Sequence, residues 1–239
     1  PASLHERFLA RFHKDFVAVP FTGAQVGSRM MRVDLAFGKR PATLDGEVYA
    51  YISERGLYTH PATAPALALE KEKRRAHSYR VARMAVERAS SAGIPEQKAL
   101  LAAALHDCGK YVPLTSPLLE DFTPPADVPA PVLHQYTGAY LARHSFGIED
   151  EEVLDAIRYH TSGKPDMTAL GMLIYLSDLL EKDRDFAGIG ELRALFAEDL
   201  PLCLYHALRG QLDYLKGTGK PVYPLTRQAY LWIKERVKG

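Results

Sequence analysis

The sequence predicts a mainly α-helical fold, a helical bundle with a small N-terminal α/β appendage. Hydrophobic residues make up 47% and charged residues 25% of the 239 positions, which is typical of a folded globular chain. Apolar residues recur at helical spacing in five segments, at 81–85, 99–103, 138–141, 153–157 and 170–174. Only residues 15–20 have the short apolar pattern of a buried strand.

The first sixty residues form the predicted appendage. The pattern indicates a helix with apolar residues at 4, 8 and 12, a strand over 15–20, and helices over 28–37 and 45–55. Gly38 and Gly56 are expected to end the last two helices. One strand is not stable alone, and the chain starts at Pro1 without an initiator Met. The appendage therefore either packs on the remainder or ends a domain whose beginning is missing.

A second unit follows, so we divide the chain into residues 1–60 and 61–239. The composition of His60–Pro65 indicates a linker between the two. Within the second, all-helical unit, the Pro-rich segment Pro113–Pro131 is long enough to be a functional loop.

Charge and composition exclude several classes of protein. Thirty Lys and Arg against 29 Asp and Glu give a net charge of +1, and no basic–aromatic stripe occurs, so neither nucleic acid nor a membrane surface is an expected partner. No apolar run approaches the ~18–20 residues that span a bilayer. Cys108 and Cys203 are too few for a disulfide framework, which favours a reducing cytoplasm.

Ionisable residues fall on the apolar stripe of five predicted helices. They are His77, His106 followed by Asp107, His134, His160 and Asp178. Unpaired burial of such groups is costly, and a metal ion is the simplest common partner. The alternative for any one of them is a satisfied core residue. The other histidines lack this placement and are interpreted as surface or packing residues: His5, His13, His60, His144 and His206.

The donor types indicate which metal the cluster would hold. Four imidazoles and two carboxylates without a thiolate favour octahedral iron or manganese over structural zinc. Asp107 could bridge two ions about 3.5–4 Å apart, an arrangement that activates water and holds phosphate oxygens. Cys108 is expected to pack at the helix end rather than to act as a ligand.

The sequence motifs around these residues resemble those of a known family. They are Arg74-Arg-Ala-His-Ser78, Ala104-Leu-His-Asp-Cys-Gly-Lys110, Leu133-His134, Ala156-Ile-Arg-Tyr-His-Thr-Ser-Gly163, Ile174-Tyr-Leu-Ser-Asp-Leu-Leu-Glu181 with Arg184, and Pro224-Leu-Thr-Arg-Gln-Ala-Tyr230. Over residues 66–235 the chain resembles the HD-domain phosphohydrolases of the YqeK family, the symmetrical bis(5'-nucleosyl)-tetraphosphatases.

The resemblance implies hydrolysis of diadenosine tetraphosphate to two ADP with one or two ions, iron being the usual metal and manganese or another divalent transition metal the alternative. It places the principal metal on His77, His106, Asp107 and Asp178. His134 and His160 would bind a second metal or the substrate phosphates, which the sequence does not separate. The implied catalytic residues are Asp107, Lys110, His134 and His160.

Substrate contacts follow from the same resemblance. They are Arg74, His134, His160, Leu179, Arg184, Thr226 and Tyr230. Arginine suits phosphate recognition, although Arg74 could also be a solvated charge. Lys110 could neutralise the leaving group or interact with a helix dipole. Ser177 and the stretch Glu181–Arg184 depart from the family pattern, which leaves the fine specificity open. The expected partner is a small nucleotide, with a homodimer as an open alternative.

The appendage resembles the C-terminal end of bacterial nicotinate-nucleotide adenylyltransferase, through Val26–Arg32 and Val48–Tyr58. The resemblance implies that Ser28 and Arg32 match positions that contact ATP phosphates at a helix N-terminus. We expect a parent protein that fuses the two enzymes. For this chain we favour a docking appendage without activity of its own, because the nucleotide-binding turn that opens such domains is absent.

Two alternatives to the tetraphosphatase function stay open. The domain could be a related phosphohydrolase that acts on another nucleotide, or a nucleotide sensor without catalysis. The complete set of six ligands argues against the sensor.

Overall fold

The computed structural model describes residues 6, 9–11 and 27–238. Over 27–238 the regular elements are helices, with no strand, which confirms the helical prediction for this part of the chain. They are α2 (Ser28–Ala36), α3 (Gly46–Glu54), α4 (Thr63–Ala68), α5 (Glu72–Ala89), η1 (Ser90–Ala92), α6 (Glu96–Leu105), η2 (Pro117–Leu119), α7 (Ala130–His144), α8 (Glu151–Arg158), α9 (Ala169–Leu180), α10 (Ile189–Glu198), α11 (Leu200–Gly217) and α12 (Pro224–Arg236).

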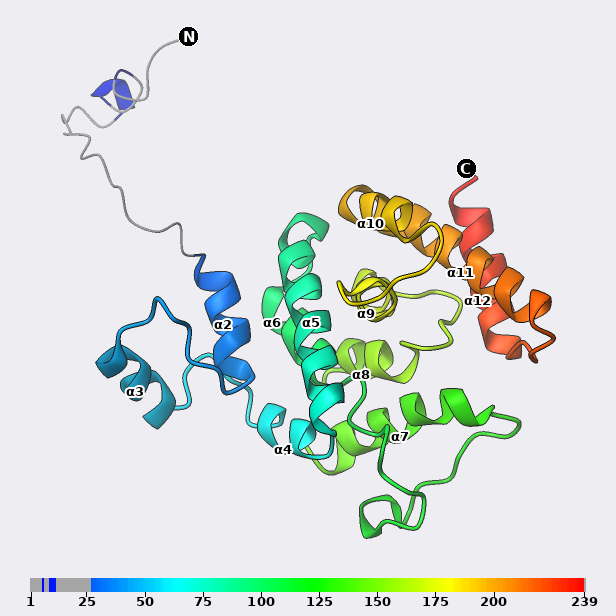
Figure 1. The fold of residues 1–239 in the computed structure, drawn as a ribbon, viewed down its shortest axis with the longest axis horizontal. Helices are drawn as coiled ribbons and strands as arrows, with labels where there is room; N and C mark the ends of the chain where they lie inside the picture. The colour runs from blue at the N-terminus through cyan, green and yellow to red at the C-terminus, as the bar shows by residue number, and fades with distance from the viewer. Residues whose placement is uncertain (1–5, 7–8, 12–26, 239) are drawn as a thin grey trace.

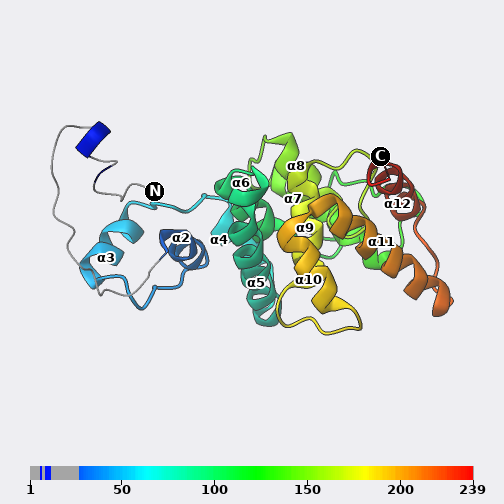
Figure 2. The ribbon, with the colours of Figure 1, turned by 90° about the horizontal axis from the view of Figure 1, so that it is seen from above.

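The core of the bundle lies where α5, α6, α8 and α9 meet (Figure 1). Helix α9 is its centre, because nine of its residues are buried and it contacts α5, α6, α8, α10 and α11. Helices α10 and α11 pack on α9, and α12 packs on α11 at the end of the bundle away from α2 and α3 (Figure 2). Fully buried Leu and Ile side chains, such as Leu105, Ile157 and Leu173, fill the space between the helices. Burial of this apolar surface is the main force that holds the helices together.

Over residues 27–60 the appendage consists of two helices joined by turns, with no strand. Helix α2 packs on α5, and α3 buries none of its residues. The expected ends are confirmed, since Asp45 caps the N-terminus of α3 and Gly38 and Gly56 take positive φ after the two helices. The predicted strand over 15–20 and the apolar positions 4, 8 and 12 lie outside the described residues, so the α/β prediction for this part stays a prediction.

The linker prediction is wrong over its second half. Helix α4 starts at Thr63 and contacts α6, and both Ala62 and Thr63 are buried. Pro65 is tolerated there because a proline in the first turn of a helix removes no intrahelical hydrogen bond. The apolar residues that follow, Ala66 and Leu67, anchor this segment on the bundle.

The Pro-rich segment is a loop, as expected, with the short helix η2 inside it and α7 starting near its end. Among the described helices, none combines the length and the apolar character that crossing a bilayer requires.

Candidate metal centre

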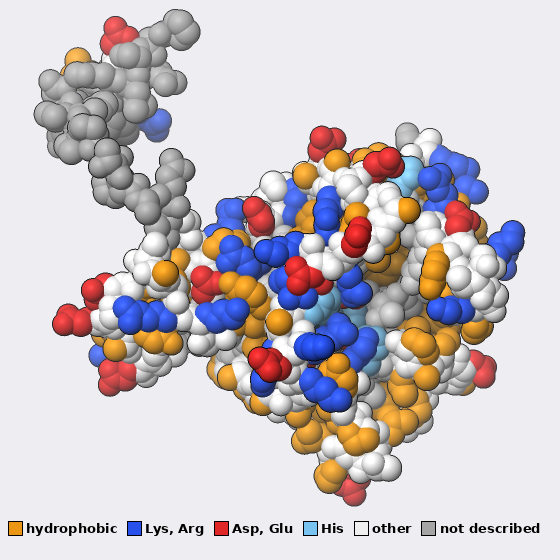
Figure 3. All heavy atoms as spheres, in the orientation of Figure 1, with side chains coloured by type: hydrophobic (Ala, Val, Ile, Leu, Met, Phe, Trp, Pro, Cys, Tyr) orange, Lys and Arg blue, Asp and Glu red, His pale blue; other side chains and the backbone are white. Residues whose placement is uncertain are grey.

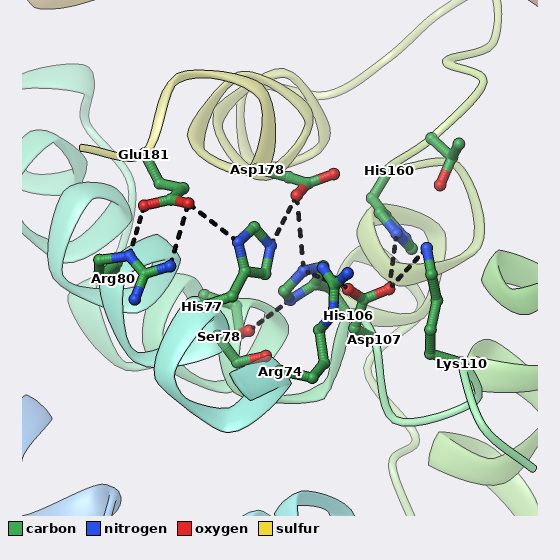
Figure 4. A network of polar contacts seen from close by, with 12 residues as sticks. Arg74, His77, Ser78, Arg80, His106, Asp107, Lys110, His160, Asp178 and Glu181 are labelled. Carbon is green, nitrogen blue, oxygen red and sulfur yellow. Dashed lines mark hydrogen bonds and ion pairs between the residues drawn. The ribbon is translucent and has the colours of Figure 1, made fainter. Parts of the chain in front are cut away.

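The predicted ligands come together at the ends of several helices (Figure 4). His77 lies on α5 and Asp178 on α9, while His134 lies early in α7. His106 and His160 follow the last turns of α6 and α8, which end at Leu105 and Arg158. The expectation that these two lie inside helices is therefore wrong by one or two residues. Because several helix ends converge at this point, the side chains that they carry can face one another.

The ligand atoms lie close enough to hold metal ions. Three groups each bring their ligand atoms within 4.8 Å of one another: His77 with His106 and Asp107, His106 with His160 and Asp178, and Asp107 with His134 and His160. The four histidines and Asp107 are buried, and the Asp178 side chain is 21% exposed. His106, Asp107 and His160 belong to two groups each, which is the arrangement expected of residues at the centre of the cluster.

Backbone hydrogen bonds orient two of the rings toward the centre. Nδ1 of His106 donates to the carbonyl oxygen of Ala103, and Nδ1 of His160 to that of Ile157, both at 2.8 Å. Each Nε2 is thereby left as a lone-pair donor. Nε2 of His106 is buried without a hydrogen-bond partner among the described residues. Because buried polar atoms are rarely left unsatisfied, the site fits a metal ion.

A second interaction chain positions His77, and the sequence analysis missed it. Nδ1 of His77 lies 3.2 Å from Oε1 of the buried Glu181, whose Oε2 accepts from Nε of Arg80 at 2.6 Å. On the other side of the ring, Nε2 lies 2.8 Å from Oδ1 of Asp178. Part of the signal was present, because Arg80 follows His77 by three residues and so shares its helical face. Glu181 follows the last residue of α9, so helical spacing does not place it.

The electrostatics favour a cation at the centre. Burial would raise the pKa of Asp107, but His106, His134 and His160 hold it well below its usual range. Burial would likewise lower the pKa of His106, but Asp107 and Asp178 raise it to about 9. Burial and the neighbouring His160 lower the pKa of His134 to about 4. The carboxylates of Asp107 and Asp178 therefore attract positive charge to the centre of the cluster.

Three basic side chains border the cluster. Arg74 is 2.8 Å from Oδ2 of Asp107, so it is an ion-pair partner of the site and not a solvated charge. Nζ of Lys110 lies 3.0 Å from Nε2 of His134, and Nη2 of Arg184 lies 3.3 Å from Oδ1 of Asp178. Histidine side chains are visible in a depression of the surface, and Lys and Arg side chains surround it (Figure 3). Such a border suits a polyanionic ligand.

The remaining predicted substrate contacts are farther from the ligand groups. Leu179 is half-buried beside Asp178, Thr226 is buried at the start of α12, and Tyr230 stacks on Tyr205 with ring centroids 5.8 Å apart. None of the three is a member of the metal-binding groups, and their contact with substrate stays a prediction.

Residues that were not assigned to the site behave as expected where they are described. Cys108 is buried and its Sγ donates to the carbonyl oxygen of Gly138 at 3.6 Å, outside the ligand groups. His60 and His144 are exposed and His206 is half-buried. His5 and His13 lie outside the described residues.

The fold and the site define a class of protein. Residues 74–183 match the model of the HD domain, and this range contains every ligand named above. The chain is 36% identical over 169 residues to the symmetrical bis(5'-nucleosyl)-tetraphosphatase of Bacillus subtilis, an alignment that covers 68% of this chain and 90% of that protein. It belongs to the family of the symmetrical bis(5'-nucleosyl)-tetraphosphatases.

Two further similarities are to a two-function protein and to a solved structure. A probable nicotinate-nucleotide adenylyltransferase/Ap4A hydrolase of Mycoplasma genitalium is 33% identical over 141 residues, which are 57% of this chain and 39% of that one. The crystal structure of a predicted HD superfamily hydrolase involved in NAD metabolism, from Clostridium acetobutylicum, superposes with a TM-score of 0.65 at 30% identity. It covers 73% of this chain and 96% of that chain.

Proposed function

We propose that this protein hydrolyses dinucleoside tetraphosphates symmetrically, converting diadenosine tetraphosphate to two molecules of ADP. The observation that carries the proposal is the complete, buried His/Asp cluster with three cations at its border, in a chain whose relatives bear the name of that activity. Water breaks one phosphoanhydride bond, so its oxygen ends on one central phosphorus and the bridging oxygen leaves with the other ADP.

A divalent metal bound here would lower the pKa of a water molecule and withdraw charge from phosphoryl oxygens. His77, His106, Asp107 and Asp178 are proposed to hold it. His134 and His160 supply either a second set of ligands with Asp107 or contacts to phosphate oxygens.

The basic residues have a separate task. Arg74, Lys110 and Arg184 would bind the phosphate oxygens and offset the charge that grows on them as the anhydride bond breaks. Their ion pairs with Asp107 and Asp178 hold the three side chains at the cluster before the substrate arrives. This preorganisation lowers the cost of binding a tetraphosphate.

Iron is the proposed metal, since imidazole and carboxylate donors suit iron or manganese and the cluster contains no thiolate. A reducing cytoplasm is the proposed location, where the buried Cys108 and Cys203 remain free thiols. The Mycoplasma relative also supports a parent protein that joins this domain to an adenylyltransferase.

The test is a timed digest of diadenosine tetraphosphate by anaerobically iron-loaded protein, with the products separated by chromatography. We expect ADP as the only product, lost in His106→Ala and retained in His206→Ala, a half-buried histidine of α11 outside the ligand groups. Formation of AMP and ATP, or no turnover despite bound metal, would overturn the proposal in favour of another phosphohydrolase or a sensor.

A further inference from the structure

We infer that the hollow beside Lys110 and His134 is a nucleoside subsite for one half of the dinucleotide, separate from the contacts expected on α9 and α12. The inference rests on the proposed function and specifies where that substrate lies. Its walls are the loop that follows Asp107 on one side and the first turns of α7 on the other.

The hollow is continuous with the metal centre. Lys110 and His134 line it, and the same two side chains meet at 3.0 Å between Nζ and Nε2. Nζ of Lys110 is also 3.6 Å from Oδ1 of Asp107, and Nε2 of His134 is 3.1 Å from that atom. A ligand whose phosphates bind the cluster can therefore extend into the hollow past Lys110.

The chemistry of the walls suits a base and a ribose. Val112, Leu114, Pro131 and Leu133 supply apolar surface, and the described lining contains no carboxylate. Leu114 is 48% exposed, so a planar base resting on it would cover apolar surface that now faces water. Lys110 at the inner end supplies the positive charge that a phosphate attached to the ribose requires.

The size of the hollow limits the ligand. Its volume is about 280 Å³, at the lower end of the roughly 300–1,000 Å³ that is usual for small-molecule pockets. This space is suited to one nucleoside and is too small for the whole dinucleotide. The other half must then lie elsewhere along the cluster.

The basic side chains at the border of the cluster indicate where the second nucleoside would lie. Lys110 and Glu181 lie at opposite ends of the cluster in Figure 4, and Arg184 lies at the Glu181 end, 4.0 Å from its Oε1. A tetraphosphate that spans the cluster from Lys110 to Arg184 would place its central bond over the ligands. One nucleoside would then enter the hollow, and the other would lie at the Arg184 end of the cluster, beside the C-terminal end of α9.

The test uses Leu114→Glu, which puts a negative charge into the hollow without disturbing a buried residue. Leu118→Glu is the matched control, because Leu118 belongs to the same loop, is 44% exposed and does not line the hollow. Initial rates are measured on iron-loaded protein with diadenosine tetraphosphate and with adenosine 5'-tetraphosphate, which has only one nucleoside. Thermal unfolding of each variant checks that the fold is intact.

We expect Leu114→Glu to raise the KM for diadenosine tetraphosphate about tenfold, the effect of losing ~1.4 kcal/mol of binding. The KM for adenosine 5'-tetraphosphate should change by much less, since its single nucleoside can use the other subsite. Leu118→Glu should resemble the wild type. An active wild type with equal KM in both variants would overturn the subsite alone. A wild type that does not cleave diadenosine tetraphosphate would overturn the proposed function and the subsite with it.

Discussion

The turn after Asp107 approaches helix α7 closely, so a substitution at this contact tests whether the position of α7 determines the geometry of the site. A Cβ atom added at Gly109 would lie 2.4 Å from the backbone nitrogen of Gly138 and 2.4 Å from Oγ1 of Thr137. Both distances are about 1 Å below the 3.4 Å at which ordinary contact begins. Thr137 cannot turn away freely, because its Oγ1 lies between the carbonyl oxygens of Gly109 and His134. Gly109→Ala must therefore push α7 away from the turn.

Two consequences follow from that displacement. Overpacking of this kind costs about 1–3 kcal/mol of unfolding free energy, which for a domain of this size lowers Tm by roughly 2–4 °C per kcal/mol. Helix α7 also carries His134, whose Nε2 is 3.1 Å from Oδ1 of Asp107. A shift near 1 Å in a positioned group can reduce turnover about 100-fold. We expect both a lower Tm and a large loss of tetraphosphatase activity.

Thermal unfolding followed by circular dichroism and the product assay with diadenosine tetraphosphate measure the two effects. Gly210→Ala is the matched control, because Gly210 lies inside α11 and an added Cβ meets nothing within 4 Å. There alanine should stabilise the helix by ~0.5–1 kcal/mol. If Gly109→Ala unfolds at the wild-type temperature with full activity, the steric reasoning is refuted.

Two further predictions concern buried carboxylates. Burial raises the pKa of Glu70 from 4.5 to about 7, so between these pH values the folded chain keeps a proton that the unfolded chain has lost. Stability falls as pH rises through this window, by about 3 kcal/mol in all, and Glu70→Gln should raise Tm at pH 8 but hardly at pH 5. An equal change in Tm at both pH values would contradict this. Glu181→Gln should weaken iron binding about 10–100-fold by disturbing His77, as measured by competition with a chelator. The exposed Glu191→Gln on α10 is its control, and equal affinities in the two variants would refute the role of Glu181.

The helices and the candidate ligands could be predicted from the sequence, because both depend on local spacing. Residues three or four apart share a helical face, so the pattern around His77 and around Asp178 indicated a buried polar side chain on each helix. The turns after α2 and α3 were equally predictable, since Gly38 and Gly56 take positive φ there. These are properties of short segments, and no other part of the chain has to be known.

Contacts between distant segments were decided only by the tertiary structure. The pairing of Arg80 with Glu181 joins residues 101 positions apart, and no spacing rule along the chain predicts it. The same holds for the anchoring of α4 on α6, which turned an expected linker into a helix. Local patterns predict which side chains a helix presents to the core, whereas the packing of the helices decides which of these side chains contact one another. The sequence by itself therefore determined the candidate donors and the helices that carry them. The tertiary structure alone decided the cluster that these donors form, because their charges stabilise one another only at the short distances that the folded chain creates.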